Sequence, residues 1–393
     1  MASTPTSGDD VIFGTTSGDT IDALAGDDAI FGGDGNDILR GGDGADTLYG
    51  GLGLDTLNGG RFGPDTASYV FSLSGVIASL ASGFGYMVDF GEAADKDKYF
   101  SIENLDGGLG NDLLYGNEYN NRLRGNNGVD QLFGYGGNDV IAGGNGGDYL
   151  TGEDGNDTIS GDAGNDRIDG GAGADFLNGG SGEDGLLYET SDAGVTVDLA
   201  ASTATGGHAT GDTISGFENM SGSGHADILR GNNTDNNLGG GGGADLLVGR
   251  GGSDELYGEA GADELRGGAG VDGLAGGGEA DVMSGGGDGD FFTYFEITDS
   301  GTAAGARDII TDFAQSEDII DITRIDARPG TMTEDAFAFI GTDSFSTGTA
   351  GEVRYFFSGG KTIVELRVDS SGGADMRIEL NGIINLTDAD FML

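Results

Sequence analysis

Apolar side chains recur at almost every ninth residue through three long stretches of the chain. The residues between them are rich in glycine and polar side chains. This pattern predicts strands of three residues whose middle side chain points inward, joined by six-residue glycine-rich turns. Such strands are too short to be stable alone, so we expect them to stack as a parallel β-solenoid. The inward positions are Ile12, Ile21, Ile30, Leu39, Leu48, Leu57 and Ala67; Leu114, Leu123, Leu132, Ile141, Leu150, Ile159, Ile168, Leu177 and Leu186; and Leu229, Leu238, Leu247, Leu256, Leu265, Leu274, Met283 and Phe292.

An acidic residue or asparagine stands two residues before each inward position, and these arrays hold seven, nine and eight copies, 24 in all. Asn121 and Asn236 occupy two of the positions. A flexible glycine-rich linker would not keep both registers in phase, which argues against disorder. The aspartates are Asp10, Asp19, Asp28, Asp37, Asp46, Asp55 and Asp65; Asp112, Asp130, Asp139, Asp148, Asp157, Asp166, Asp175 and Asp184; and Asp227, Asp245, Asp254, Asp263, Asp272, Asp281 and Asp290.

Two related inserts separate the arrays, because residues 67–80 match 186–199 and residues 101–117 match 216–232. A strand-rich segment without the period follows Tyr294, and it includes a hairpin expected at 352–368. The predicted fold class is therefore all-β, with three β-rolls in series and a β-rich C-terminal domain. The expected segments are a first roll (1–68), an insert (69–106), a second roll (107–187), an insert (188–221), a third roll (222–293) and the C-terminal domain (294–393).

The charge balance points to cations as partners. The 393 residues include 68 acidic and 17 basic side chains, for a formal net charge of −51. Nucleic acid would be repelled by this charge. With no cysteine and two histidines, disulfides and typical zinc sites are also excluded, which leaves hard ions bound through oxygen. No apolar run is long enough for a transmembrane segment, and the N-terminus shows no cleavable signal peptide.

The units GGDGNDILR (32–40) and GGDGADTLY (41–49) resemble the RTX calcium-binding nonapeptide, GGxGxDxUx, in which U is a large apolar residue. The resemblance implies that Ca²⁺ lies between turns 18 residues apart, held by aspartate carboxylates and turn carbonyl groups. Two turns fewer than each array holds gives up to about 18 ions. Sites that share Asn121 or Asn236 are expected to bind more weakly. The turn residues expected to help are Gly33, Asp34, Gly35, Gly42, Asp43, Gly44, Gly144, Asn145, Gly146, Asp154, Gly155, Gly171, Gly173, Gly241 and Gly243.

The C-terminal segment 306–326 and the final residues resemble the C-terminal region of serralysin-type secreted proteases. In that family this region carries the signal for a type I secretion apparatus, and Asp390 followed by Phe391, Met392 and Leu393 fits such a signal. The resemblance implies a secreted, extracellular protein. The zinc-binding HExxH motif of the proteases and the GxSxG motif of lipases are absent from the sequence, so we expect no enzymatic activity.

The expected function is that of a non-enzymatic protein that folds on extracellular Ca²⁺ and serves as cell-surface, surface-layer, matrix or adhesion material. Self-association or binding of a surface polysaccharide would fit this role. The alternative is a calcium-binding and secretion module associated with an extracellular enzyme or a membrane-active toxin. Phe13, Phe31 and Tyr49, with Tyr115 and Phe133, form outward aromatic ladders that are either a binding face or simple cross-strand stacking.

Overall fold

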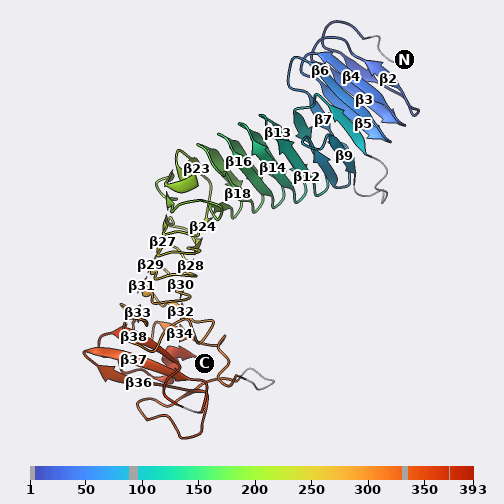
Figure 1. Cartoon of the computed structure of the whole chain (residues 1–393). Coiled ribbons are helices and arrows are strands. Elements are labelled where there is room, and N and C mark those ends of the chain that lie inside the picture. The colour runs from blue at the N-terminus through green and yellow to red at the C-terminus, as the bar shows by residue number, and fades with distance from the viewer. Residues whose placement is uncertain (1–4, 88–95, 330–334, 371) are drawn as a thin grey trace. The chain divides into compact units, whose positions relative to one another are not determined.

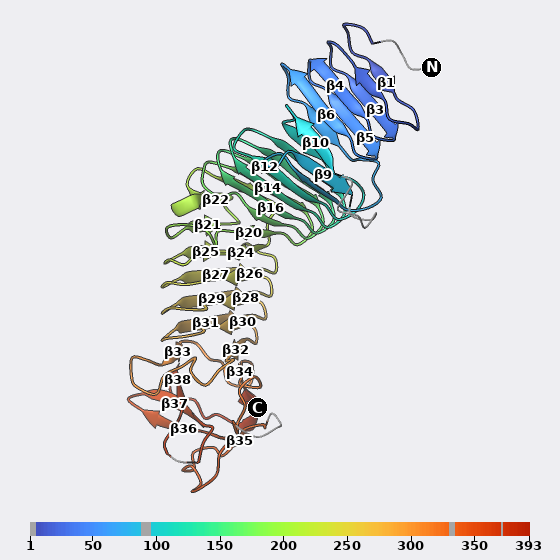
Figure 2. The same cartoon turned by 45° about the vertical axis from the view of Figure 1, so that its right-hand side comes forward.

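The computed structural model describes residues 5–87, 96–329, 335–370 and 372–393. The chain forms two compact units, residues 1–187 with 210–217 and residues 188–209 with 218–393. In each unit, consecutive strands alternate between two walls of stacked parallel strands (Figures 1 and 2). The predicted β-solenoid is confirmed. In the described residues no helix has the length and apolarity that a membrane span requires.

One wall of the first unit is a sheet of ten strands in which every described pairing is parallel. Partners within the arrays lie 18 residues apart, as Ile12 opposite Ile30 shows. In stacking order the strands are β1 (Val11–Phe13), β3 (Ala29–Asp34), β5 (Thr47–Leu52), β7 (Thr66–Ser68), β11 (Asn104–Asp106), β13 (Arg122–Asn127), β15 (Val140–Asn145), β17 (Thr158–Ala163), β19 (Phe176–Ser181) and β23 (Thr213–Ser215).

The opposite wall of this unit contains the one reversed strand among its described members. β9 pairs antiparallel with both β8 and β10, and these two strands pair in parallel with the arrays on either side. The insert therefore continues the solenoid. The strands of this wall are β2 (Thr20–Asp22), β4 (Ile38–Asp43), β6 (Thr56–Arg61), β10 (Asp97–Phe100), β9 (Phe84–Met87), β8 (Val76–Ser79), β12 (Leu113–Asn117), β14 (Gln131–Gly136), β16 (Tyr149–Asp154), β18 (Arg167–Asp169) and β20 (Gly185–Leu187).

The second unit begins with an antiparallel hairpin of β21 (Thr196–Asp198) and β22 (Thr203–Thr205). A 3-10 turn spans Gly207–Ala209. β21 starts one wall, which continues in parallel through β25 (Ile228–Arg230), β27 (Leu246–Gly251), β29 (Glu264–Ala269), β31 (Val282–Gly287) and β33 (Asp308–Ile310). The other wall consists of β24 (Asn219–Ser221), β26 (Asn237–Gly239), β28 (Glu255–Tyr257), β30 (Gly273–Ala275), β32 (Phe291–Thr293), β34 (Ile319–Asp321) and β39 (Phe391–Met392).

The end of the second unit is a sheet added to β33. β38 (Met376–Asn381) pairs in parallel with β33 and antiparallel with β37 (Lys361–Arg367). The hairpin predicted at 352–368 is present, with β36 (Glu352–Ser358) opposite β37. β35 (Ala338–Phe339) pairs with β36, and a 3-10 turn spans Asp388–Asp390.

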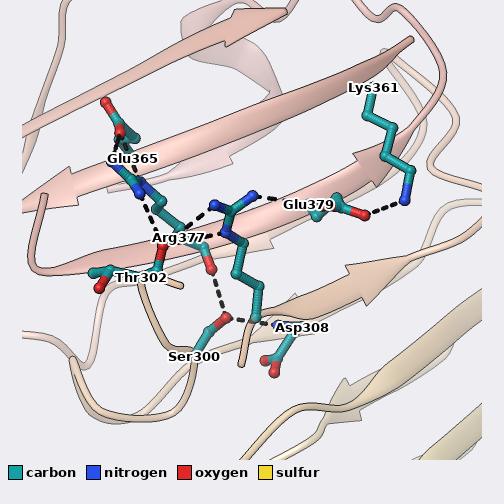
Figure 3. A network of polar contacts seen from close by, with 8 residues as sticks. Ser300, Thr302, Asp308, Lys361, Glu365, Arg377 and Glu379 are labelled. Atoms are coloured by element: carbon teal, nitrogen blue, oxygen red, sulfur yellow. Dashed lines mark hydrogen bonds and ion pairs between the residues drawn. The ribbon is translucent and has the colours of Figure 1, made fainter. Parts of the chain in front are cut away.

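A polar network joins this added sheet to the last row of the solenoid (Figure 3). The Arg377 guanidinium donates to the buried carboxylate of Glu365 at 2.7 Å and to the Thr302 carbonyl at 2.8 Å. The Ser300 hydroxyl donates to the Arg377 carbonyl at 2.6 Å and accepts the Asp308 N–H at 2.8 Å. The final strands are thereby held by ionic and backbone contacts as well as by β pairing.

The core follows the predicted register. Every predicted inward side chain is buried except Ile21, which is half-buried on β2. Strand length differs from the prediction, since several strands contain six residues rather than three. These longer strands extend into the next turn because its glycines allow pairing to continue, as Gly33 opposite Gly51 illustrates.

Candidate metal centre

The aspartate that ends each turn links two turns on the same edge of a unit. Its Oδ1 accepts a hydrogen bond from the backbone N–H of the aspartate 18 residues earlier. The Asp28 N–H donates to Asp46 Oδ1 at 2.9 Å, and the Asp130 N–H donates to Asp148 Oδ1 at 2.8 Å. These side chains are at most a few per cent exposed. The conserved spacing therefore places one carboxylate inside each stack of turns.

The second carboxylate oxygen of most of these aspartates is buried and accepts no hydrogen bond from the described residues. Leaving a buried carboxylate oxygen without a partner is costly, so an additional electrophile is needed there. This applies to Oδ2 of Asp28, Asp37, Asp46, Asp55, Asp130, Asp139, Asp148, Asp157, Asp166, Asp175, Asp245, Asp254, Asp263, Asp272, Asp281, Asp290 and Asp308.

Glycine creates the space beside this oxygen. A Cβ atom at Gly32 would lie 2.4 Å from Asp37 Oδ2 and 2.5 Å from the Gly50 carbonyl oxygen, so both oxygens border one small space. A Cβ atom at Gly44 would lie 2.0 Å from the Gly26 carbonyl oxygen. Each turn thus combines a carboxylate oxygen with closely packed backbone carbonyls.

The predicted turn residues lie within this arrangement. Gly33, Gly35, Gly42 and their counterparts have positive φ, with Gly33 at 108°. The side chains at the third turn position point to solvent, so only their backbone faces the stack. These exposed residues are Asp34, Asp43, Asn145 and Asp154. Positive φ is found at Gly33, Gly35, Gly42, Gly44, Gly144, Gly146, Gly155, Gly171, Gly241 and Gly243, whereas Gly173 has none.

Burial makes these carboxylates poor anions in the absence of a cation. Desolvation is the largest cause, and it raises the pKa of Asp139, Asp175 and Asp263 to about 7 although backbone hydrogen bonds oppose the shift. Neighbouring aspartates raise these pKa values further. At neutral pH a bound cation would restore the charged form.

The available donors suit a hard cation such as Ca²⁺, which prefers carboxylate and carbonyl oxygens. Among the residues that the structure describes, no group of three or more His, Cys, Asp or Glu side chains forms a metal cluster. Carbonyl groups must therefore supply most ligands. This matches the space beside Asp37, where a carboxylate and a carbonyl oxygen meet.

The first two turns of each array differ from the later ones. The Thr15 N–H donates to Asp19 Oδ2 at 2.7 Å, and the Ser223 N–H donates to Asp227 Oδ2 at 2.5 Å. Asp10 and Asp112 accept the same bond from residues 6 and 108. These four carboxylates were predicted as ligands, and in the structure each closes its own turn.

Asn121 and Asn236 also close their own turns. Asn121 Oδ1 accepts the Asn117 N–H at 2.8 Å, and its amide group donates to the Glu103 carbonyl at 2.8 Å. Asn236 accepts from Asn232 and donates to the Glu218 carbonyl, both at 2.7 Å. An amide N–H thus faces a carbonyl where a weak cation site was expected.

Five carboxylates outside the nine-residue phase also link the stacked turns. Asp97 Oδ1 accepts the Asp55 N–H at 3.0 Å, and Glu103 accepts the Asp65 N–H at 2.8 Å. Each member stands two residues before an inward apolar side chain, so the local motif Asp/Glu-x-apolar would have found them. The five are Asp97, Glu103, Asp212, Asp308 and Asp318.

A buried tyrosine follows the last aspartate of every array by four residues. Tyr69, Tyr188 and Tyr294 are at most 7% exposed. The Tyr69 hydroxyl donates to Asp97 Oδ2 at 2.8 Å and lies 2.5 Å from the Tyr99 hydroxyl. A protein hydroxyl therefore satisfies the oxygen that lacks a partner in most array turns.

Replacement of Tyr69 by Phe is expected to destabilise the first unit by about 1–3 kcal/mol, because the buried Asp97 carboxylate loses a donor. The denaturation midpoint in saturating Ca²⁺ measures this effect. Tyr119→Phe is the control, since Tyr119 is 74% exposed. Equal midpoints for both variants would show that the hydroxyl contributes nothing.

The aromatic ladders consist of rings stacked on one another. The ring centroids are 4.8 Å apart for Phe13 and Phe31, 4.3 Å for Phe31 and Tyr49, and 5.2 Å for Tyr115 and Phe133. Cross-strand stacking therefore occupies most ring faces and leaves ring edges toward solvent.

A family model described as the RTX calcium-binding nonapeptide repeat (four copies) matches residues 4–39, 31–62, 102–118, 115–150, 151–186, 221–256, 239–274 and 257–292. The solved structures that resemble the chain include two subunits of the mannuronan C5-epimerase of Azotobacter vinelandii, both 23% identical. AlgE6R3 matches with a TM-score of 0.27 over 43% of this chain and 79% of its own. AlgE6R2 matches with a TM-score of 0.26 over 44% and 90%. No curated protein matches the sequence.

Proposed function

The chain belongs to the family of RTX calcium-binding nonapeptide-repeat proteins, and from this premise we propose that it is a secreted, non-enzymatic protein that folds when extracellular Ca²⁺ fills its turns. The observation that carries this proposal is the set of buried Oδ2 atoms without a protein donor beside turn carbonyls. Ca²⁺ supplies two positive charges at each of these places.

The proposed number of ions follows from the backbone of the turns. Eighteen of the 24 turns have positive φ at their second residue, divided among the arrays as five, seven and six. Eighteen Ca²⁺ ions would reduce the formal charge from −51 to about −15. This removes most of the self-repulsion that opposes compaction.

Dependence on Ca²⁺ would couple folding to location. External calcium near the millimolar range would fill sites that remain empty at cytosolic calcium levels, so the chain would pass a type I secretion apparatus unfolded and fold outside. The resulting polyanion would serve as cell-surface, surface-layer, matrix or adhesion material. The second candidate is a calcium-binding module of an extracellular enzyme or toxin.

Two measurements on the whole chain test this proposal. Native mass spectrometry at rising Ca²⁺ is expected to show uptake of about 18 ions together with a compact charge-state distribution. Sedimentation in Ca²⁺, with and without an acidic polysaccharide, is expected to show self-association or complex formation. A chain that binds no Ca²⁺ would refute the whole proposal, whereas a calcium-loaded monomer without affinity for polysaccharide would refute the surface role.

A further inference from the structure

The second residue of each turn adopts one of two backbone conformations. It has positive φ in 18 turns, and the carboxylate of these turns accepts no N–H from that residue. In the other six turns it lacks positive φ and its N–H donates to the side-chain oxygen of the residue that ends the same turn. The donors of these six bonds are Thr6, Thr15, Gly108, Asn117, Ser223 and Asn232.

Resting on the calcium-binding function proposed above, we infer that the backbone conformation of this second residue decides whether a turn takes Ca²⁺ or closes on itself. In a closed turn the N–H points a positive hydrogen at the oxygen that a cation would need. Because the N–H and C=O of a peptide group point in opposite directions, turning this group over removes the hydrogen and brings the preceding carbonyl oxygen toward the carboxylate. One rotation therefore exchanges a blocked turn for a cation site.

The rule also holds outside the arrays. The Ala314 N–H donates to Asp318 Oδ2 at 2.7 Å, and Ala314 lacks positive φ. Asp318 links to the preceding turn through its other oxygen, since the Asp290 N–H donates to Asp318 Oδ1 at 3.0 Å. A carboxylate can thus keep its structural bond and still be closed to cations.

Seven of the 18 open turns hold a residue other than glycine at this position, although a side chain disfavours positive φ. We expect these turns to close first as Ca²⁺ is withdrawn and to need more Ca²⁺ to open. They would set a graded response along the chain, with glycine turns filling at lower concentrations. The seven residues are Leu24, Asn126, Tyr135, Glu153, Asp162, Arg250 and Glu259.

Leu24 offers the clearest test, because its side chain is uncharged and 53% exposed and its φ is 82°. Leu24→Gly removes the backbone penalty, and Leu24→Val increases it because a β-branched residue tolerates positive φ least. Hydrogen exchange of a peptide covering residues 20–30 in the full chain, at graded Ca²⁺, reports the midpoint for this turn. Leu52→Gly is the control, since Leu52 is 46% exposed in the same array and lacks positive φ.

The midpoint for this turn is expected to fall by about fivefold or more in Leu24→Gly and to rise in Leu24→Val. Leu52→Gly should leave it unchanged. A side chain with a merely structural role would give weaker binding in both Leu24 variants, and that result would overturn the inference. If the original chain shows no calcium-dependent protection, the proposed function fails instead.

Discussion

Excess chelator at neutral pH is expected to abolish most of the sheet structure of this protein. Each turn buries a carboxylate that burial and neighbouring aspartates hold at a high pKa, about 7 for Asp130 and Asp290. Without a cation these groups must either take up protons or leave the interior. Far-UV circular dichroism during stepwise chelation should show loss of the β signal, and adding Ca²⁺ should restore it.

Magnesium is the matched control for this experiment. Mg²⁺ carries the same charge but demands a near-octahedral shell and retains its water molecules, so it should restore much less structure at equal concentration. Recovery with both ions would indicate general charge screening rather than specific sites. A chelated chain that keeps its full β signal and its melting temperature would contradict the calcium-dependent fold.

The calcium-free chain is expected to regain sheet structure on acidification. Desolvation raises the pKa of Asp55 and Asp65 to about 7, compared with about 3.9 for an unfolded aspartate. A raised pKa means that the folded state binds protons more tightly, so its contribution to stability is complete below about pH 4 and is lost as the pH rises through about 7. The calcium-loaded chain should show the opposite trend, because protons displace the ion from the carboxylates.

Circular dichroism between pH 3 and pH 8, on chelated and calcium-loaded samples, measures both trends. Light scattering must accompany it, because the sequence pI is about 4.1 and precipitation there would imitate a structural change. A calcium-free chain that is equally unfolded at pH 4 and pH 8 would show that carboxylate burial does not control folding. Parallel pH curves for the two samples would contradict competition between protons and Ca²⁺.

The register of the solenoid could be predicted because both of its requirements are local. One inward side chain in nine, such as Leu132, fixes the strand phase, and the aspartate two residues earlier fixes the end of the turn. The pairing of units 18 residues apart is confirmed by Leu132 opposite Leu150. Strand length was not predictable in the same way, since the extension of β3 into its next turn depends on pairing with β5.

The linking carboxylates outside the arrays required the three-dimensional structure. Asp97 accepts a bond from Asp55, 42 residues earlier, and Asp308 accepts one from Asp281, 27 residues earlier. Neither spacing belongs to the period. Chain folding in the intervening segments sets these distances, and a search for the nine-residue period therefore passes over them.

The amino-acid sequence by itself determined the repeating unit, the two faces of each strand and the oxygen chemistry of the turns, because each depends on residues within a span of nine. Tertiary structure alone decided which carboxylates are open to a cation. Asp19 and Asp37 occupy the same place in the motif, yet Asp19 Oδ2 accepts the Thr15 N–H while Asp37 Oδ2 accepts no bond from the described residues. The difference lies in the orientation of one peptide group, and that orientation depends on the turn stacked against it.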